Sequence, residues 1–173
     1  GASSIAYLSI GDGIQWGCCG PLEASSAAIF RAYLEQRVGR PTIWQATSSN
    51  YLTTDTFISD GSTEPQLDFA IKLIRHYRDD GVPLAAITMS IGGNNLVDIG
   101  SSCASPPCRD LFLAGLGHLS EQLDIIYSRI VAAKDEHTPL LALLYYDSNE
   151  CSHNPYSGPS VDAWNAVIAE VAG

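Results

Sequence analysis

The sequence predicts an α/β fold, a three-layer αβα sandwich with helices on both faces of a central parallel sheet. Short apolar runs of strand length alternate along the chain with longer segments whose apolar residues recur at helical spacing. Continuous apolar runs are typical of parallel strands that are buried on both faces. Because the alternation continues without a linker or an internal repeat, we expect one domain over residues 1–173.

The first half of the chain supplies two of the expected strands. The apolar run Ile5–Ile10 predicts a buried strand that ends at a glycine-rich turn. A helix is expected over Leu22–Val38, with Gly39 directly after it as a stop signal. Thr42–Gln45 has the length of a short strand, and residues 46–64, rich in Ser and Thr, are expected to form a loop.

The second half repeats the pattern. Helical spacing of apolar residues predicts helices around Leu67–Tyr77 and Leu119–Ile130, and a last helix over Val161–Val171. Between them, Leu84–Ile91 and Leu140–Tyr146 are apolar runs of strand length. Strands and helices therefore alternate four times. Since ligands of open parallel sheets bind at the carboxyl ends of the strands, we expect the functional residues there.

Charge excludes some classes of partner. The 173 residues include 9 Lys and Arg against 19 Asp and Glu, a net charge of −10. Such a surface repels phosphate backbones and anionic membranes, which argues against nucleic acid as a partner. No apolar run approaches the roughly 20 residues of a transmembrane helix. A neutral ester, sugar or peptide remains compatible with this charge.

The cysteines favour an oxidising compartment. Cys103 and Cys108 enclose a short Pro-rich loop that a disulfide would close, and Cys151 could pair with Cys18 or Cys19. Such disulfides predict a secreted protein; five reduced thiols in a cytosolic protein are the alternative. No cysteines have zinc-ligand spacing, so we expect no metal and no other cofactor.

Four segments together resemble the SGNH/GDSL family of hydrolases. Gly11–Gly13 and the following Trp16-Gly17 are similar to the first block of that family, Gln45–Leu52 to the second and Ile91–Leu96 to the third. Val161–Ile168 looks like the helix that precedes the last strand of the family. The resemblance covers the whole chain in the right order. It implies the flavodoxin-like SGNH fold, with the last strand missing from this sequence.

The resemblance implies hydrolysis of carboxylic esters, such as lipid or acetyl-sugar substrates. The family uses a Ser nucleophile, a His base and an oxyanion hole, which is ordinary acyl-transfer chemistry. Asp12 matches the first block, but Gly13 stands at the nucleophile position and has no side chain that could attack. The resemblance therefore implies that this chain is inactive. The backbone donor of the second block falls on Gln45.

The third block supplies the remaining site residues. Asn94 matches the oxyanion Asn, Gly92 the block's Gly, and Asn95 stands where the family usually has Asp. The Asp-x-x-His block that carries the family's base is absent. His153, in the loop after the fourth strand, is a candidate replacement for that base.

Three functions stay open at this point. The first is an ester hydrolase that Gly13 has silenced. The second is a pseudoenzyme of the same fold that binds an acylated sugar, lipid or protein. The third is an assembly subunit whose open sheet edge another chain completes. Cys18 or Cys19 could also replace the missing nucleophile, because thiolates attack esters.

Overall fold

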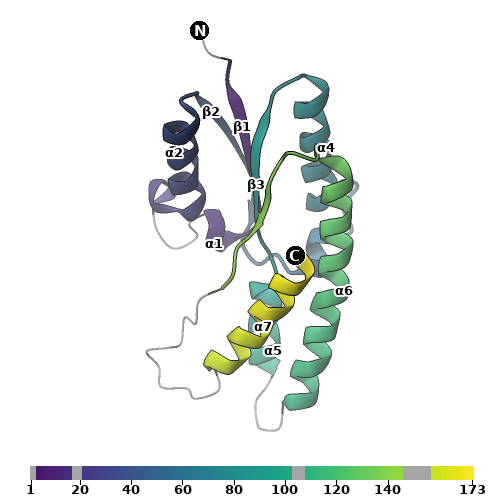
Figure 1. Ribbon diagram of the computed structural model, residues 1–173. Helices are drawn as coiled ribbons and strands as arrows, with labels where there is room; N and C mark the ends of the chain where they lie inside the picture. The colour runs from purple at the N-terminus through teal and green to yellow at the C-terminus, as the bar shows by residue number, and fades with distance from the viewer. Residues whose placement is uncertain (1–2, 17–20, 103–107, 146–156) are drawn as a thin grey trace.

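The sheet of the protein is parallel and has helices on both of its faces (Figure 1), which confirms the predicted α/β class. The computed structural model describes residues 3–16, 21–102, 108–145 and 157–173. Within these residues the sheet has four strands in the order β2-β1-β3-β4. The strands are β1 (Ile5–Asp12), β2 (Thr42–Ser49), β3 (Leu84–Ser90) and β4 (Leu140–Ala142).

Seven α-helices connect or flank these strands in the described part of the chain. They are α1 (Gly13–Trp16), α2 (Ser26–Val38), α3 (Thr54–Ile58), α4 (Gln66–Asp79), α5 (Gly93–Ser102), α6 (Arg109–Ala133) and α7 (Ser157–Ala172). Local signals set their ends. Ser25 caps α2 by accepting the Ala28 N–H, and Gly39 ends the helix in a left-handed conformation.

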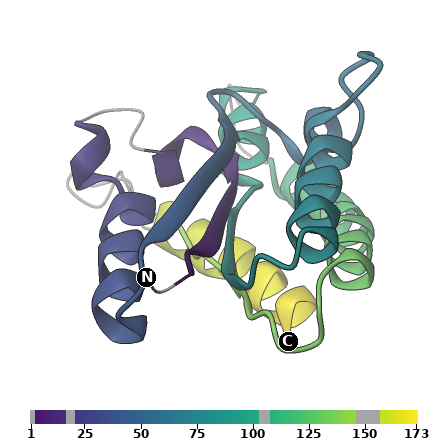
Figure 2. The ribbon, with the colours of Figure 1, turned by 90° about the horizontal axis from the view of Figure 1, so that it is seen from above.

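The core forms on both sides of β1, all of whose residues are buried. Leu8 and Ile10 face the larger apolar cluster, built mainly with α4, α6 and α7. Tyr7 faces the smaller cluster under α2. Seen from above, α2 lies on one side of the sheet and α4 with α6 on the other (Figure 2). The alternation of neighbouring residues between faces is the period-2 geometry of a strand.

Two strands differ from the sequence-based expectation. β2 continues to Ser49, four residues beyond the expected end at Gln45, because its Thr and Ser residues pair with β1 as far as Asp12. β4 is shorter than predicted and ends at Ala142. The expected loop 46–64 therefore contains the end of a strand, and it also contains α3.

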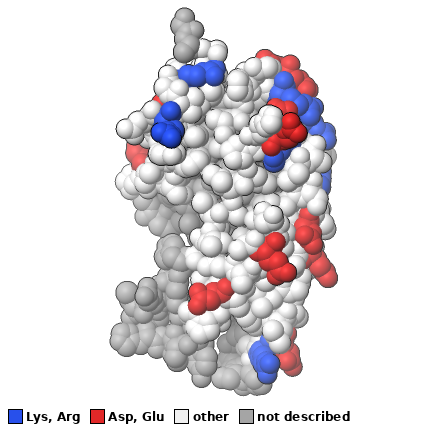
Figure 3. Space-filling model, viewed as in Figure 1, with Lys and Arg blue, Asp and Glu red and all other residues white. Residues whose placement is uncertain are grey.

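Charged side chains on the face shown in Figure 3 are unevenly placed. Carboxylates lie along the side formed by α6 and α7, and acidic and basic groups mix near the upper end. Between α4 and α6, Asp68 pairs with Arg129 at 2.6 Å. Among the residues that the structure describes, no helix is long and apolar enough to span a membrane.

Candidate active site

The first and third motifs meet at the carboxyl edge of the sheet, together with the end of β2. Asp12, the last residue of β1, aligns with Ser49 of β2, and Gly11 aligns with Ser90 of β3. The turn at Gly92 follows Ser90 by two residues. The expectation that polar and glycine residues gather at this edge is therefore met by the strand register.

Gly13 opens α1 immediately after β1. Its φ is negative, since it is not among the described glycines in the left-handed region. A serine adopts the same helical backbone without strain, so the conformation at this position does not require glycine. The site nevertheless lacks a nucleophilic side chain at this point of the chain.

Asp12 is buried and connects β1 with β3 and with the segment after β4. Its Oδ1 accepts the Ser90 hydroxyl at 3.0 Å, and its Oδ2 accepts the Tyr145 hydroxyl at 2.5 Å. Burial of the phenol raises the pKa of Tyr145 well above its usual value, and the nearby Asp12 charge raises that pKa further. Tyr145 therefore stays protonated at neutral pH and acts as a hydrogen-bond donor to Asp12.

Glycine at position 93 makes room for the Tyr145 ring. A Cβ on Gly93 would lie 2.5 Å from Tyr145 Cε1, which is closer than carbon atoms can approach. Asn165 of α7 binds the main chain of Tyr145: its Oδ1 accepts the Tyr145 N–H at 2.8 Å, and its Nδ2 donates to the Tyr145 carbonyl at 2.7 Å. The ring thus packs on α5 at Gly93, while the main chain of the same residue is bound to α7.

The turn at Gly92 is also held by α7. The buried indole of Trp164 donates from Nε1 to the Gly92 carbonyl at 3.1 Å. Gly92 has a φ of 110°, a backbone conformation in which an L side chain is strained. Gly92 therefore shapes the turn through which β3 reaches Asn94.

Asn94 lies in the first turn of α5 and points its amide toward the segment after β2. Its Nδ2 donates to the Leu52 carbonyl at 2.8 Å. A side-chain amide nitrogen carries two hydrogens, so this bond orients the amide and uses only one of them. The other N–H has no acceptor among the described residues and is suited to stabilise a negative oxygen.

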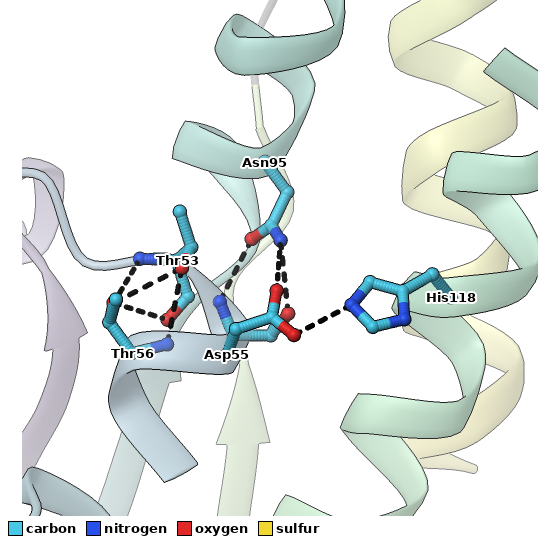
Figure 4. Close-up of polar contacts among 6 residues, drawn as sticks. Thr53, Asp55, Thr56, Asn95 and His118 are labelled. Atoms are coloured by element: carbon cyan, nitrogen blue, oxygen red, sulfur yellow. Dashed lines mark hydrogen bonds and ion pairs between the residues drawn. The ribbon is translucent and has the colours of Figure 1, made fainter. Parts of the chain in front are cut away.

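Asn95 binds the start of α3 with both ends of its amide (Figure 4). Its Oδ1 accepts the Thr54 N–H at 2.9 Å, and its Nδ2 donates to Thr54 Oγ1 at 3.1 Å. The same Nδ2 lies 3.5 Å from Asp55 Oδ2, and Asp55 Oδ1 pairs with His118 Nε2 of α6 at 2.7 Å. An amide at position 95 suits this site, because a carboxylate there would face Asp55.

Three predicted site residues are placed apart from this cluster or lie outside the described residues. Gln45 lies within β2 and pairs with Leu8, four residues before Ser49, so β2 meets the edge at Ser49 instead. His153 lies outside the described residues, and so does Cys103. The predicted Cys103–Cys108 bridge therefore stays a prediction, as does the role of His153.

Every histidine of the described part pairs with a nearby acid. His76 contacts Asp80, His137 contacts Glu136, and His118 contacts Asp55. None of these contacts involves Asp12, so no described histidine is shown beside the nucleophile position. In the same part of the chain, no group of three or more His, Cys, Asp or Glu side chains could hold a metal ion.

The sequence patterns did not identify Ser90 and Tyr145, whose hydroxyls bind Asp12. Ser90 and Tyr145 lie within apolar runs that predict only strands. The Asp55–His118 pair joins residues 63 positions apart, and no local pattern signals such a contact. Only the polar character of Ser90 at a strand end could have pointed to the site.

Solved structures of esterases and lipases share this architecture. A lipase from a goat rumen metagenome, Lip_vut3, superposes with a TM-score of 0.68 at 15% identity over 97% of this chain and 74% of its own. The chain has the SGNH hydrolase fold. TesA superposes at 0.59 with 16% identity, covering 96% of this chain and 72% of that one.

A third structure of this fold is Axe2, an acetylxylan esterase from Geobacillus stearothermophilus. It superposes with a TM-score of 0.60 at 13% identity, over 97% of this chain and 71% of its own. No protein-family model matches the sequence, and no curated protein matches it significantly. At these identities the likeness extends to the SGNH fold, and the chemistry has to be argued from the residues.

Proposed function

We propose that this SGNH fold carries a carboxyl-ester site whose hydrolytic step is silenced in this chain by Gly13. The observation that carries the proposal is the position of Asn94. Its orienting bond to the Leu52 carbonyl leaves one amide N–H for the carbonyl oxygen of an ester. The ends of β1, β2 and β3 form the edge of the sheet beside it.

The chemistry of the site follows from what is present and what is missing. In ester hydrolysis, a hydroxyl attacks the carbonyl carbon while a base accepts its proton, and the oxyanion that forms needs fixed donors. Asn94 supplies a donor, and the start of α1 supplies backbone N–H groups at the first motif. Gly13 supplies no hydroxyl, so the ester is bound and polarised without an attack from this position.

The test compares the protein with its Gly13→Ser variant. We expect no hydrolysis of 4-nitrophenyl acetate by the protein itself, and measurable hydrolysis by the variant. A fluorophosphonate probe should add covalently to the variant alone, with the adduct found on residue 13 by peptide mass spectrometry. A Ser128→Ala change in the same background, on the exposed surface of α6, serves as a control for a surface hydroxyl.

The proposal fails if Gly13→Ser gives neither hydrolysis nor labelling and the protein also binds no ester. Labelling of a cysteine in the unmodified protein would instead identify a thiol nucleophile, and it would contradict the silencing by Gly13.

A non-catalytic binding function is the second candidate. It is favoured by Asp12, whose two carboxylate oxygens accept hydrogen bonds from Ser90 and Tyr145, while the described histidines pair elsewhere. Replacing the nucleophile alone would be enough to silence a hydrolase. In this chain, in addition, no described histidine is paired with Asp12 to serve as a base near Gly13. Specific binding of an acylated ligand, together with an inactive Gly13→Ser variant, would favour this second function.

A further inference from the structure

A cleft between α4 and α6 is lined mainly by basic side chains. It has a volume of about 410 Å³, and its lining residues are Asp68, Ile71, Lys72 and Arg75 of α4 and Arg129 of α6. Three of the nine Lys and Arg residues of the chain therefore lie around one cleft, in a protein with a net charge of −10. The volume is within the range of pockets that bind small molecules, about 300–1,000 Å³.

The sequence of α4 places its lining residues on one face of the helix. Asp68, Lys72 and Arg75 follow one another at intervals of four and three residues, the spacing that brings side chains together along a helix. Ile71 is buried in the larger apolar cluster and forms the floor of the cleft, whereas Lys72 and Arg75 are exposed. α6 packs against this face and supplies Arg129. The cleft thus combines an apolar floor with basic walls.

The three cations of the cleft differ in their partners. Arg129 Nη2 lies 2.6 Å from Asp68 Oδ1, and both residues line the cleft. Lys72 Nζ lies 3.0 Å from Glu64 Oε1, which belongs to the segment before α4. Arg75 has no hydrogen bond or ion pair with any residue that the structure describes. One lining acid therefore faces three lining cations, and the Arg75 guanidinium is available to an anion from solution.

The charge of the whole protein restricts the size of that anion. At physiological ionic strength the Debye length is about 8 Å, so a small anion in the cleft responds mainly to the cations beside it. A long polyanion or an anionic membrane would extend beyond the cleft to the acidic remainder of the surface. Figure 3 shows carboxylates of this kind along the side formed by α6 and α7. The charge distribution therefore favours a small ligand.

We propose that this cleft binds a small organic anion that carries at least two carboxylate or phosphate groups. Guanidinium groups bond either kind of group through two parallel N–H donors. Arg75 and Lys72 bind one anionic group, and Arg129 binds the second in competition with Asp68. The carbon skeleton of the ligand covers Ile71. No lining residue belongs to the candidate active site, so the proposal does not depend on the ester function.

Titration of the intact protein tests the cleft, because binding needs no catalytic activity. The probes are citrate and fructose 1,6-bisphosphate, with acetate as a control that carries one anionic group. Binding is followed at low, constant ionic strength by calorimetry and by the NMR shifts of the arginine Nε–H groups. We expect saturable binding of at least one polyanion, weaker binding of acetate, shifts at Arg75 and Arg129, and loss of affinity at high salt. The tighter probe identifies the preferred anionic group.

Substitutions with opposite expected effects separate the site from general attraction. Arg75→Gln should weaken the polyanion by about twofold to fivefold, the range of an exposed charge pair. Asp68→Asn should strengthen it by a similar factor, because Arg129 loses its competing carboxylate, and a poorly folded variant would not gain affinity. Arg37→Gln on α2 is the matched control: Arg37 is also exposed, has no partner among the described residues, and should be replaceable without effect.

Three results would overturn the proposal. The first is that neither polyanion binds saturably. The second is an equal loss of affinity in Arg37→Gln and Arg75→Gln, which would show attraction without a site. The third is binding of a hexaglutamate peptide at these arginines when neither small anion binds, which would indicate an acidic protein partner instead. None of these results affects the ester function, and an inactive Gly13→Ser variant would not affect the anion cleft.

Discussion

Replacing Tyr145 by Phe tests whether the hydrogen bonds around Asp12 hold the site together. The change removes only the hydroxyl that donates to Asp12 Oδ2 at 2.5 Å and keeps the ring that packs on Gly93. A hydrogen bond to a charged group contributes about 1.5–3 kcal/mol. Asp12 retains Ser90 as a donor, so we expect the free energy of unfolding to fall by about 2 kcal/mol.

The assay is urea denaturation at pH 7, followed by circular dichroism and fluorescence. In a thermal melt, the same loss of about 2 kcal/mol lowers Tm by roughly 4–8 °C for a chain of this size. Tyr127→Phe is the matched control: Tyr127 is buried in the core, and its hydroxyl has no hydrogen bond among the described residues. That control should change the free energy of unfolding by less than about 0.5 kcal/mol.

Two results would refute this reasoning. One is a Tyr145→Phe protein as stable as its parent; the other is an equal loss in Tyr127→Phe. A double-mutant cycle with Asp12→Asn gives a direct measure, because it isolates the coupling between the two side chains from the effects of each change alone.

Further outcomes are expected at alkaline pH and at the third motif. Since burial raises the pKa of Tyr145 in the folded state, its contribution to stability is complete below about pH 10. Above this pH the contribution falls by up to about 1.4 kcal/mol per pH unit. Between pH 9 and 11, the free energy of unfolding should therefore fall less steeply with pH in Tyr145→Phe than in the parent protein. Asn95→Asp should destabilise by about 1 kcal/mol through repulsion from Asp55, and a thermal melt should show recovery in the Asn95→Asp, Asp55→Asn double variant. Gly93→Ala should cost about 1–3 kcal/mol in urea, because its methyl group overlaps the Tyr145 ring, and Tyr145→Ala in the same chain should relieve much of that cost.

The sequence was sufficient to predict the architecture because the core signals are local. Continuous apolar runs gave β1 and β3, and the spacing of apolar residues gave α4 and α6. The end of β2 was missed, since its Thr and Ser residues are as common in loops as in strands, and only the pairing with β1 makes them a strand.

The candidate site could be predicted only where one short segment carries it. Asp12, Gly13 and Asn94 were singled out because each belongs to a motif that follows a strand. Tyr145 and the Asp55–His118 pair depend on contacts between distant segments, which no pattern in a single sequence specifies. The assignment of Gln45 relied on matching a weak motif, whereas strand register brings Ser49 to the edge.

The contact between Asn165 and Tyr145 has a consequence for association between molecules. With one acceptor and one donor, the Asn165 amide binds the main-chain N–H and the carbonyl of Tyr145, three residues beyond β4. Exposed strand edges recruit other chains, and proteins that stay separate protect such edges. Because Asn165 already binds both main-chain groups of Tyr145, another strand cannot form main-chain hydrogen bonds with that residue.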